Sequence, residues 1–95
     1  MISSKKINKT YRLCHGTTME DIDGNIVLLK DNGDAVTMND TAAEILKLVI
    51  TKGTLPAGDI LREKYDVDAI NIGNDIDELT QELVRSDLIE PIASV

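Results

Sequence analysis

The feature that most constrains the fold is a change of hydrophobic period at Asn39. Two short apolar runs, Ile26 to Leu29 and Ala35 to Met38, precede it and flank the sequence Asp-Asn-Gly-Asp. Asn-Gly between two such runs is the strongest short-range signal of a β-hairpin, because both residues tolerate a positive φ. Beyond it, apolar residues recur on one helix face, at Ala42, Ile45, Leu46 and Val49. The sequence therefore predicts a hairpin that runs directly into a helix.

A third strand is expected before the hairpin. Apolar residues are sparse there, so the sequence predicts only weak strands, around residues 11–14 and 19–22. A turn at Asp23-Gly24-Asn25 would join the second weak strand to the hairpin. The expected result is a three-stranded antiparallel meander.

Three helices are predicted after the meander. Asn39, Asp40 and Thr41 can each accept a backbone N–H from the first turn of the first helix, and Glu44 lies at capping-box spacing from Thr41. We expect this helix to run to about Ile50. The sequence Thr-Leu-Pro predicts the start of the second helix, because a backbone N–H in the first turn has no partner within the helix and a proline there loses no hydrogen bond. Its predicted inward residues are Ile60, Leu61 and Tyr65.

The third helix is expected to begin either at Asp68 or near Asn71. Its apolar residues follow a regular helical pattern, and its acids lie elsewhere around the cylinder. The predicted inward residues are Ile72, Ile76, Leu79 and Leu83. After this helix, Leu88, Ile89 and Ile92 are expected to form a short packed tail, which Pro91 ends.

The whole chain of 95 residues is expected to hold one domain, over residues 11–92, behind a flexible basic arm of residues 1–10. The predicted fold class is α+β and winged-helix-like, with a three-stranded antiparallel sheet followed by three α-helices. With no Phe, no Trp and two Tyr, the core must be aliphatic, and little aromatic surface is left for stacking bases or flat cofactors.

Charge is distributed unevenly along the chain. Residues 1–19 carry +4, whereas residues 20–95 hold six bases against seventeen acids. Such an acidic body repels a phosphate backbone, which argues against a nucleic-acid partner. The chain has no signal-peptide pattern and no apolar run of about 20 residues, so we expect no membrane partner. A single cysteine fits a reducing compartment, and we expect a cytoplasmic protein.

Metal, covalent and phosphate chemistry find little support. Cys14 and His15 are adjacent, so on a strand they point to opposite faces and cannot easily converge on one ion. No base with an orienting third group accompanies the thiol. The acids around residues 31–40 and 66–77 lack the ligand spacing of an EF-hand loop, and turn chemistry and helix starts account for them. The glycines are scattered singly, so no phosphate loop is present. We therefore expect no enzyme activity, no metal and no cofactor.

The remaining candidate for a functional site is a binding surface. A three-stranded meander has two edges, and an edge strand exposes backbone groups with which another chain can pair. Adding a peptide strand beside a helix is a known mode of recognition, in which the backbone supplies affinity and side-chain pockets supply specificity. A homodimer through the same edge is also possible.

Three stretches together resemble a known family. They are "NIVLLKDNGDAVTMNDTAAEILKLV", "TLPAGDILREKYDVD" and "DIDELTQELVRSDLIEP". Asn39, Thr41, Ala42, Ala43, Ile45 and Leu48 match its first helix start, Thr54, Ile60, Tyr65 and Val67 fit its second helix, and Leu79, Leu83, Leu88 and Ile89 fit its third. The family is the PqqD-like family, small proteins or domains called RiPP recognition elements, where RiPP denotes a ribosomally made, modified peptide. The likeness covers roughly residues 19–90.

Three departures from the family pattern are visible. Met38 stands where the family usually has Leu, a change that conserves volume and should cost little. Asp87 stands where a Gly usually precedes the last apolar pair, which indicates a different end to the third helix. Thr54 and Ile60 are one residue further apart than is usual, which leaves the start of the second helix open.

The resemblance implies a non-enzymatic peptide-binding protein. Such proteins bind the leader of a precursor peptide as an added strand beside the third strand, in the groove against the third helix. They present the peptide to a modifying enzyme, frequently a radical SAM enzyme, or to a leader peptidase in lasso-peptide pathways. Pyrroloquinoline quinone, lasso-peptide and other pathways stay open. By position, the implied peptide-binding residues are Ala35, Val36, Thr37, Met38, Ile72, Asp75, Ile76, Glu78, Leu79, Glu82, Leu83 and Arg85.

Several points stay open at the level of sequence. Val36 and Met38 share one face of the strand and Ala35 and Thr37 the other, and either pair could meet the groove. The main alternative function is a winged-helix transcription regulator or protein interaction domain. A recognition helix for DNA needs a basic face, however, and the third helix holds Arg85 against several acids. A quinone-biosynthesis enzyme would need an acid–base or metal constellation that the sequence lacks.

Overall fold

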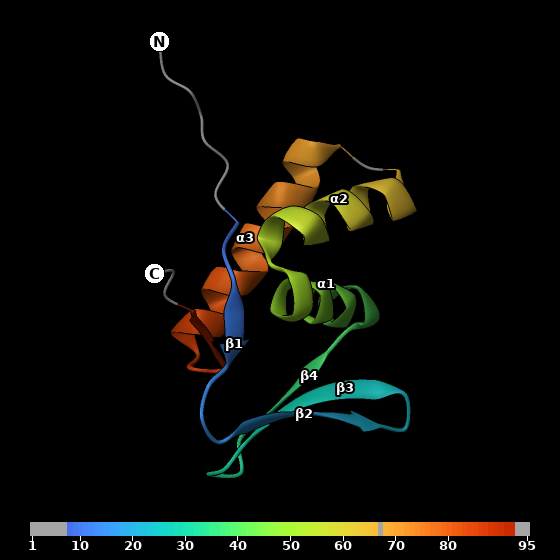
Figure 1. The fold of residues 1–95 in the computed structure, drawn as a ribbon. Coiled ribbons are helices and arrows are strands. Elements are labelled where there is room, and N and C mark those ends of the chain that lie inside the picture. Colours follow the sequence, from blue (N-terminus) through green and yellow to red (C-terminus); the bar gives the residue numbers. More distant parts are fainter. Residues whose placement is uncertain (1–7, 67, 93–95) are drawn as a thin grey trace.

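A computed structural model describes residues 8–66 and 68–92 (Figure 1). A strand meander lies below a group of three helices, and the last strand of the meander rises into the first helix (Figure 1). The strands are β1 (Tyr11–Leu13), β2 (Thr17–Ile22), β3 (Asn25–Lys30), β4 (Ala35–Met38) and β5 (Ile89–Pro91). The helices are α1 (Asp40–Lys52), α2 (Thr54–Tyr65) and α3 (Ala69–Arg85). The predicted α+β fold, an antiparallel three-stranded sheet followed by three helices, is confirmed.

The meander has the strand order β2-β3-β4, and both of its turns form where they were predicted. Asp23 and Gly24 turn with φ of 54° and 85°. In the second turn, Gly33 has a φ of 98°, while Asn32 stays out of the left-handed region. Asn32 contributes through its side chain, whose Oδ1 accepts the N–H of Asp34 at 2.9 Å. Of the two residues of the Asn-Gly pair, only the glycine thus uses a positive φ.

A second sheet was not predicted. β1 pairs antiparallel with β5, with Tyr11 opposite Pro91 and Leu13 opposite Ile89. The sequence indicated a weak strand near the first of these segments but only a packed tail near the second. The Cys14 N–H continues the pairing by donating to the Leu88 carbonyl at 3.0 Å. The two ends of the domain are thereby tied together beside α3 (Figure 1).

Asn39 alone caps α1 through its side chain, whose Oδ1 accepts the N–H of Ala42 at 2.7 Å. The predicted capping box does not form, because Asn39 and not Thr41 is the N-cap, so Glu44 lies beyond the capping position and its carboxylate reaches α2. It binds Lys64 at 2.5 Å and accepts a short hydrogen bond from the Tyr65 hydroxyl. These contacts clamp α1 to the end of α2.

The start of α2 is capped from a distant part of the chain. Gly53 precedes the helix and has no side chain for capping, but Asn8 lies against it and accepts the N–H of Leu55 at 3.0 Å. The Lys9 N–H also donates to the hydroxyl of Thr54 at 3.0 Å. Residues 1–7 of the predicted basic arm lie outside the described residues, so the arm itself stays a prediction.

The inward face of α2 differs from the prediction. Leu61 is buried, as expected, but Ile60 is 37% exposed and Tyr65 is 47% exposed. Ala57 provides the second buried position. Tyr65 is drawn outward because its hydroxyl binds Glu44, so an aromatic residue at an apolar helical spacing lies at the rim of the core.

α3 ends in a Schellman motif without glycine. Asp87 has a φ of 59°, in the left-handed region that glycine favours. The Leu88 N–H donates to the Leu83 carbonyl and the Asp87 N–H to the Val84 carbonyl, both at 3.0 Å. Asp87 thus replaces the usual glycine but still adopts the left-handed conformation that ends the helix.

The core forms two clusters that meet at α1. One lies between the meander, α1 and the end of α3, and its buried members are Ile26, Leu28, Met38, Ala43, Leu46, Leu83, Leu88 and Ile89. The other lies between the three helices, with Ile45, Val49, Ala57, Leu61 and Ile76 buried. Both are aliphatic, as the composition required.

Candidate functional site

The outer edge of β4 offers backbone groups for pairing. Among the described residues, β3 is the only strand beside β4. The Lys30 N–H donates to the Asp34 carbonyl at 2.8 Å, and Leu28 stands opposite Val36. Hydrogen-bonded pairs alternate along an antiparallel ladder, so Val36 and Met38 direct their backbone groups toward β3. The N–H and C=O groups of the alternate residues, Ala35 and Thr37, therefore point outward.

The two faces of β4 meet different surroundings. Met38 is buried in the same cluster as Leu83 of α3, so this face of the strand is turned toward the helices. Val36 shares that face by the alternation of a strand and is 40% exposed. Ala35 and Thr37 lie on the opposite face and are exposed. Of the two pairs that the sequence left open, Val36 and Met38 are thus the pair on the face that is turned toward the helices.

A hollow of about 260 Å³ lies at the end of β4, between the start of α1 and α3. It begins at Asn39, the residue that directly follows the strand. Four of the residues that the family resemblance implied line it from α3, namely Asp75, Glu78, Leu79 and Glu82. From α1 and its N-cap, the lining residues are Asn39, Thr41, Ala42 and Ile45.

The α1 side of this hollow was missed at the level of sequence. The sequence patterns indicate a capping role for Thr41 and core positions for Ala42 and Ile45. Ala42 and Ile45 do pack in the core. The usable signal was the immediate succession of β4 and α1. A helix that starts one residue after an edge strand must place its first turn beside any peptide that extends that edge.

The rim of the hollow is acidic. Asp75, Glu78 and Glu82 are exposed, and within the described part of the chain none of them forms an ion pair. Arg85, one turn further along α3, is also exposed and unpaired there. A ligand in this hollow meets three negative charges.

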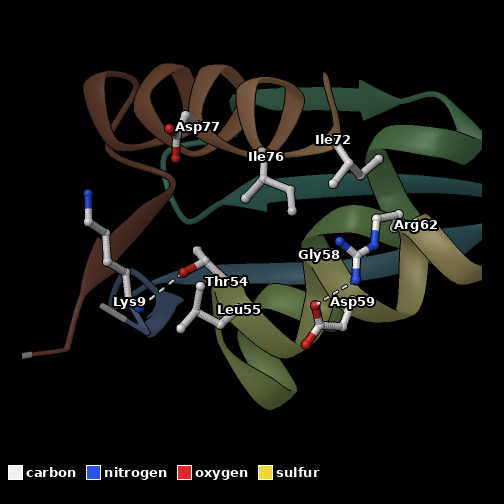
Figure 2. Close-up of a pocket in the computed structure, with 10 residues that line it drawn as sticks. Lys9, Thr54, Leu55, Gly58, Asp59, Arg62, Ile72, Ile76 and Asp77 are labelled. Atoms are coloured by element: carbon white, nitrogen blue, oxygen red, sulfur yellow. Dashed lines mark hydrogen bonds and ion pairs between the residues drawn. The ribbon is translucent and has the colours of Figure 1, made fainter. Parts of the chain in front are cut away.

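The other implied residues lie elsewhere. Ile72 and Ile76 line a separate hollow of about 330 Å³ between α2 and α3 (Figure 2). Figure 2 shows them facing Leu55 across this space, near the Arg62–Asp59 ion pair of 3.7 Å. Leu83 is buried in the core between the meander and the helices. The predicted set of site residues is thus split between the two sides of α3 and the interior.

No residue combination for metal or covalent chemistry is evident in residues 8–66 and 68–92. No three potential metal ligands gather there. Cys14 is half-buried and His15 exposed. Burial, followed by the nearby charges of Glu90 and Asp87, raises the pKa of the Cys14 thiol, which disfavours the reactive thiolate. Across these same residues, no helix has the length and apolar character needed to cross a membrane.

Comparison with known proteins identifies the family. Residues 24–89 match the family described as coenzyme PQQ synthesis protein D (PqqD). The chain belongs to the PqqD family. The match runs from the turn before β3 to the first residue of β5, so it includes β4, α1 and α3 and thus every wall of the hollow. No curated protein matches this PqqD-family chain.

Two solved structures resemble this PqqD-family fold over most of its length. One is described as lasso peptide synthetase B1 complexed with the leader peptide, with a TM-score of 0.79, 25% identity and coverage of 85% of this chain and 98% of the other. The second is TbiB1 in complex with the TbiA(beta) leader peptide, with a TM-score of 0.73, 22% identity and coverage of 87% and 99%. The similarity to the second shows a shared fold.

Proposed function

We propose that this chain is a non-enzymatic recognition protein that binds the leader of a ribosomally synthesised precursor peptide. The observation that carries the proposal is the outer edge of β4, which pairs with no other strand among the described residues and lies beside a hollow between α1 and α3. Membership of the PqqD family and the likeness to a lasso peptide synthetase B1 in complex with a leader peptide support it.

The leader binds as an additional strand on β4. Its backbone pairs with the outward N–H and C=O groups of Ala35 and Thr37, which gives affinity with little dependence on sequence. Its side chains alternate between the outer face and the face of Val36 and Met38, which is turned toward the helices. Beyond the strand it enters the hollow, whose apolar surface is provided by Ala42, Ile45 and Leu79.

The bound leader places the rest of the precursor within reach of a modifying enzyme. This partner is a radical SAM enzyme or a leader peptidase, in pyrroloquinoline quinone, lasso-peptide or another peptide-modification pathway. Recognition and chemistry then reside in different proteins. The homodimer through the same edge stays a prediction, since a second copy would occupy the same backbone groups.

An NMR titration tests the proposal. The probe is a synthetic peptide with the sequence of a candidate precursor leader. We expect the amide signals of Ala35 to Met38 and of α3 to shift. Shifts confined to residues 8–10 would contradict strand addition.

A backbone substitution sharpens this test. Thr37→Pro removes an outward N–H without removing a donor from the β3–β4 ladder. Loss of one hydrogen bond should weaken leader binding by about 2- to 12-fold, and the proline ring adds a steric cost. Thr37→Val is the matched control, because it keeps the N–H and the branched side-chain shape. Equal affinity of the proline and valine variants would show that β4 does not pair with the leader.

A further inference from the structure

The acidic rim of the hollow lies along one side of α3. Asp75, Glu78 and Glu82 are separated by three and four residues, which places them on neighbouring turns of one helix face. Asp77, on the same helix, lines the other hollow, toward α2. The three acids therefore face the space where a strand added to β4 would continue.

Nothing in the described part of the protein neutralises these charges. The ion pairs there join Arg12 to Glu90, Arg62 to Asp59 and Lys64 to Glu44, all away from the hollow. Residues 20–95 as a whole carry eleven more acids than bases, which adds a negative background field. A basic ligand in the hollow would therefore meet carboxylates that are not already paired with a described residue.

The spacing of the acids matches that of an extended chain. A helix rises 1.5 Å per residue, so Glu78 and Glu82 are offset by about 6 Å along α3. Side chains on one face of a strand recur every two residues, or about 6.6 Å. A strand that lies along α3 can thus direct two side chains, at positions i and i+2, toward these two carboxylates.

We propose that the acidic rim selects leaders that carry Lys or Arg at alternate positions, i and i+2, in the segment beside α3. The inference rests on the proposed function, because the peptide site itself is given by the β4 edge and the rim only determines which sequences fit it. Exposed ion pairs are individually weak, so two of them should improve affinity by about 2- to 30-fold and should weaken as salt is raised.

A displayed library of random twelve-residue peptides tests the inference, because it samples basic residues at every position of the ligand. The bait is the full chain, and recovered peptides are titrated by fluorescence anisotropy and by NMR. We expect peptides that shift the β4 amides to be enriched in Lys or Arg at i and i+2. They should bind the double variant Glu78→Lys/Glu82→Lys about 2- to 30-fold more weakly, and replacing their two bases by Glu should restore binding to that variant.

The matched control is Asp77→Lys/Glu63→Lys, which changes the net charge of the protein by the same amount at exposed positions outside the hollow. It should bind the recovered peptides with nearly unchanged affinity. If both double variants weaken binding equally, only net charge matters and the rim has no selective role.

The two levels of the proposal fail differently. Peptides that shift the β4 amides but show no basic enrichment, or bind the Glu78→Lys/Glu82→Lys variant as well as the wild type, refute selection by the rim and leave leader binding intact. If no recovered peptide shifts the β4 amides, strand addition fails, and selection by the rim fails with it.

Discussion

Gly53→Ala tests the way in which the start of the described chain is fixed to the helices. Gly53 has φ 95° and ψ 172°, a region that is essentially restricted to glycine, so alanine there costs about 1–3 kcal/mol of backbone strain. The added Cβ also overlaps the side-chain amide of Asn8. If Asn8 moves away, the Leu55 N–H loses its capping acceptor, which costs about 1 kcal/mol more. We expect a total loss of about 2–4 kcal/mol in the free energy of unfolding.

A double-mutant cycle separates the two contributions. Asn8→Ala alone should cost about 1 kcal/mol, the value of a lost helix cap. In that background Gly53→Ala meets no side chain, so only the backbone strain remains and the two losses should fall short of additivity by about 1 kcal/mol. Urea unfolding of the four proteins measures this. Strict additivity, or a cost of Gly53→Ala below about 0.5 kcal/mol, would refute the packing of Asn8 against the glycine.

Two further predictions concern α2 and its contact with α1. Leu61→Ala should lower the free energy of unfolding by about 2–5 kcal/mol and Ile60→Ala by about 1 kcal/mol or less, since only Leu61 is fully buried. Urea unfolding measures both losses, and equal losses would contradict the burial of Leu61 and the exposure of Ile60 on α2. Hydrogen bonds from Lys64 and Tyr65 lower the pKa of Glu44 from its ordinary value of 4.5. The stability that this lowered pKa provides is present above pH 4.5 and is lost as the pH falls through the lowered pKa. The free energy of unfolding, measured between about pH 5 and pH 3, should therefore depend less on pH in Glu44→Gln than in the wild type.

Local signals predicted the centre of the fold well. Asn32-Gly33 lies between two apolar runs, and the turn forms there because glycine can adopt the left-handed conformation that the hairpin needs. Asn39 begins α1 because its side chain satisfies a free N–H of the first turn. In both cases the residues that decide the structure are within a few positions of one another.

Non-local pairing explains what was missed. β1 and β5 are each three residues long, and their partners stand at opposite ends of the chain, with Arg12 opposite Glu90. Neither segment carries a strong strand pattern, so only the tertiary arrangement shows that they pair. The outward position of Tyr65 has a similar origin, since its partner Glu44 lies on another helix.

The sequence predicts only part of the candidate site, because the rest depends on contacts between residues far apart in the chain. The β4 edge follows from strand count alone, and the acids of α3 follow from helical spacing. Which of these acids share a hollow depends on how α3 lies against α1. That packing places Glu78 beside the start of α1 and Asp77 beside α2, although the two are adjacent in sequence.

The core also determines which backbone groups of β4 are available to a ligand. Met38 is buried, and Leu28, which stands opposite Val36, is fully buried. A shift of β4 by one residue would turn Met38 to the outer face and Thr37 into the core, which burial of an unpaired hydroxyl opposes. The same shift would exchange the backbone groups that face β3 with those that face outward. The apolar packing of Met38 thus fixes the outward direction of the Thr37 N–H. A substitution that loosens the core between β4 and the helices should therefore weaken leader binding, although it changes no residue at the outer edge of β4.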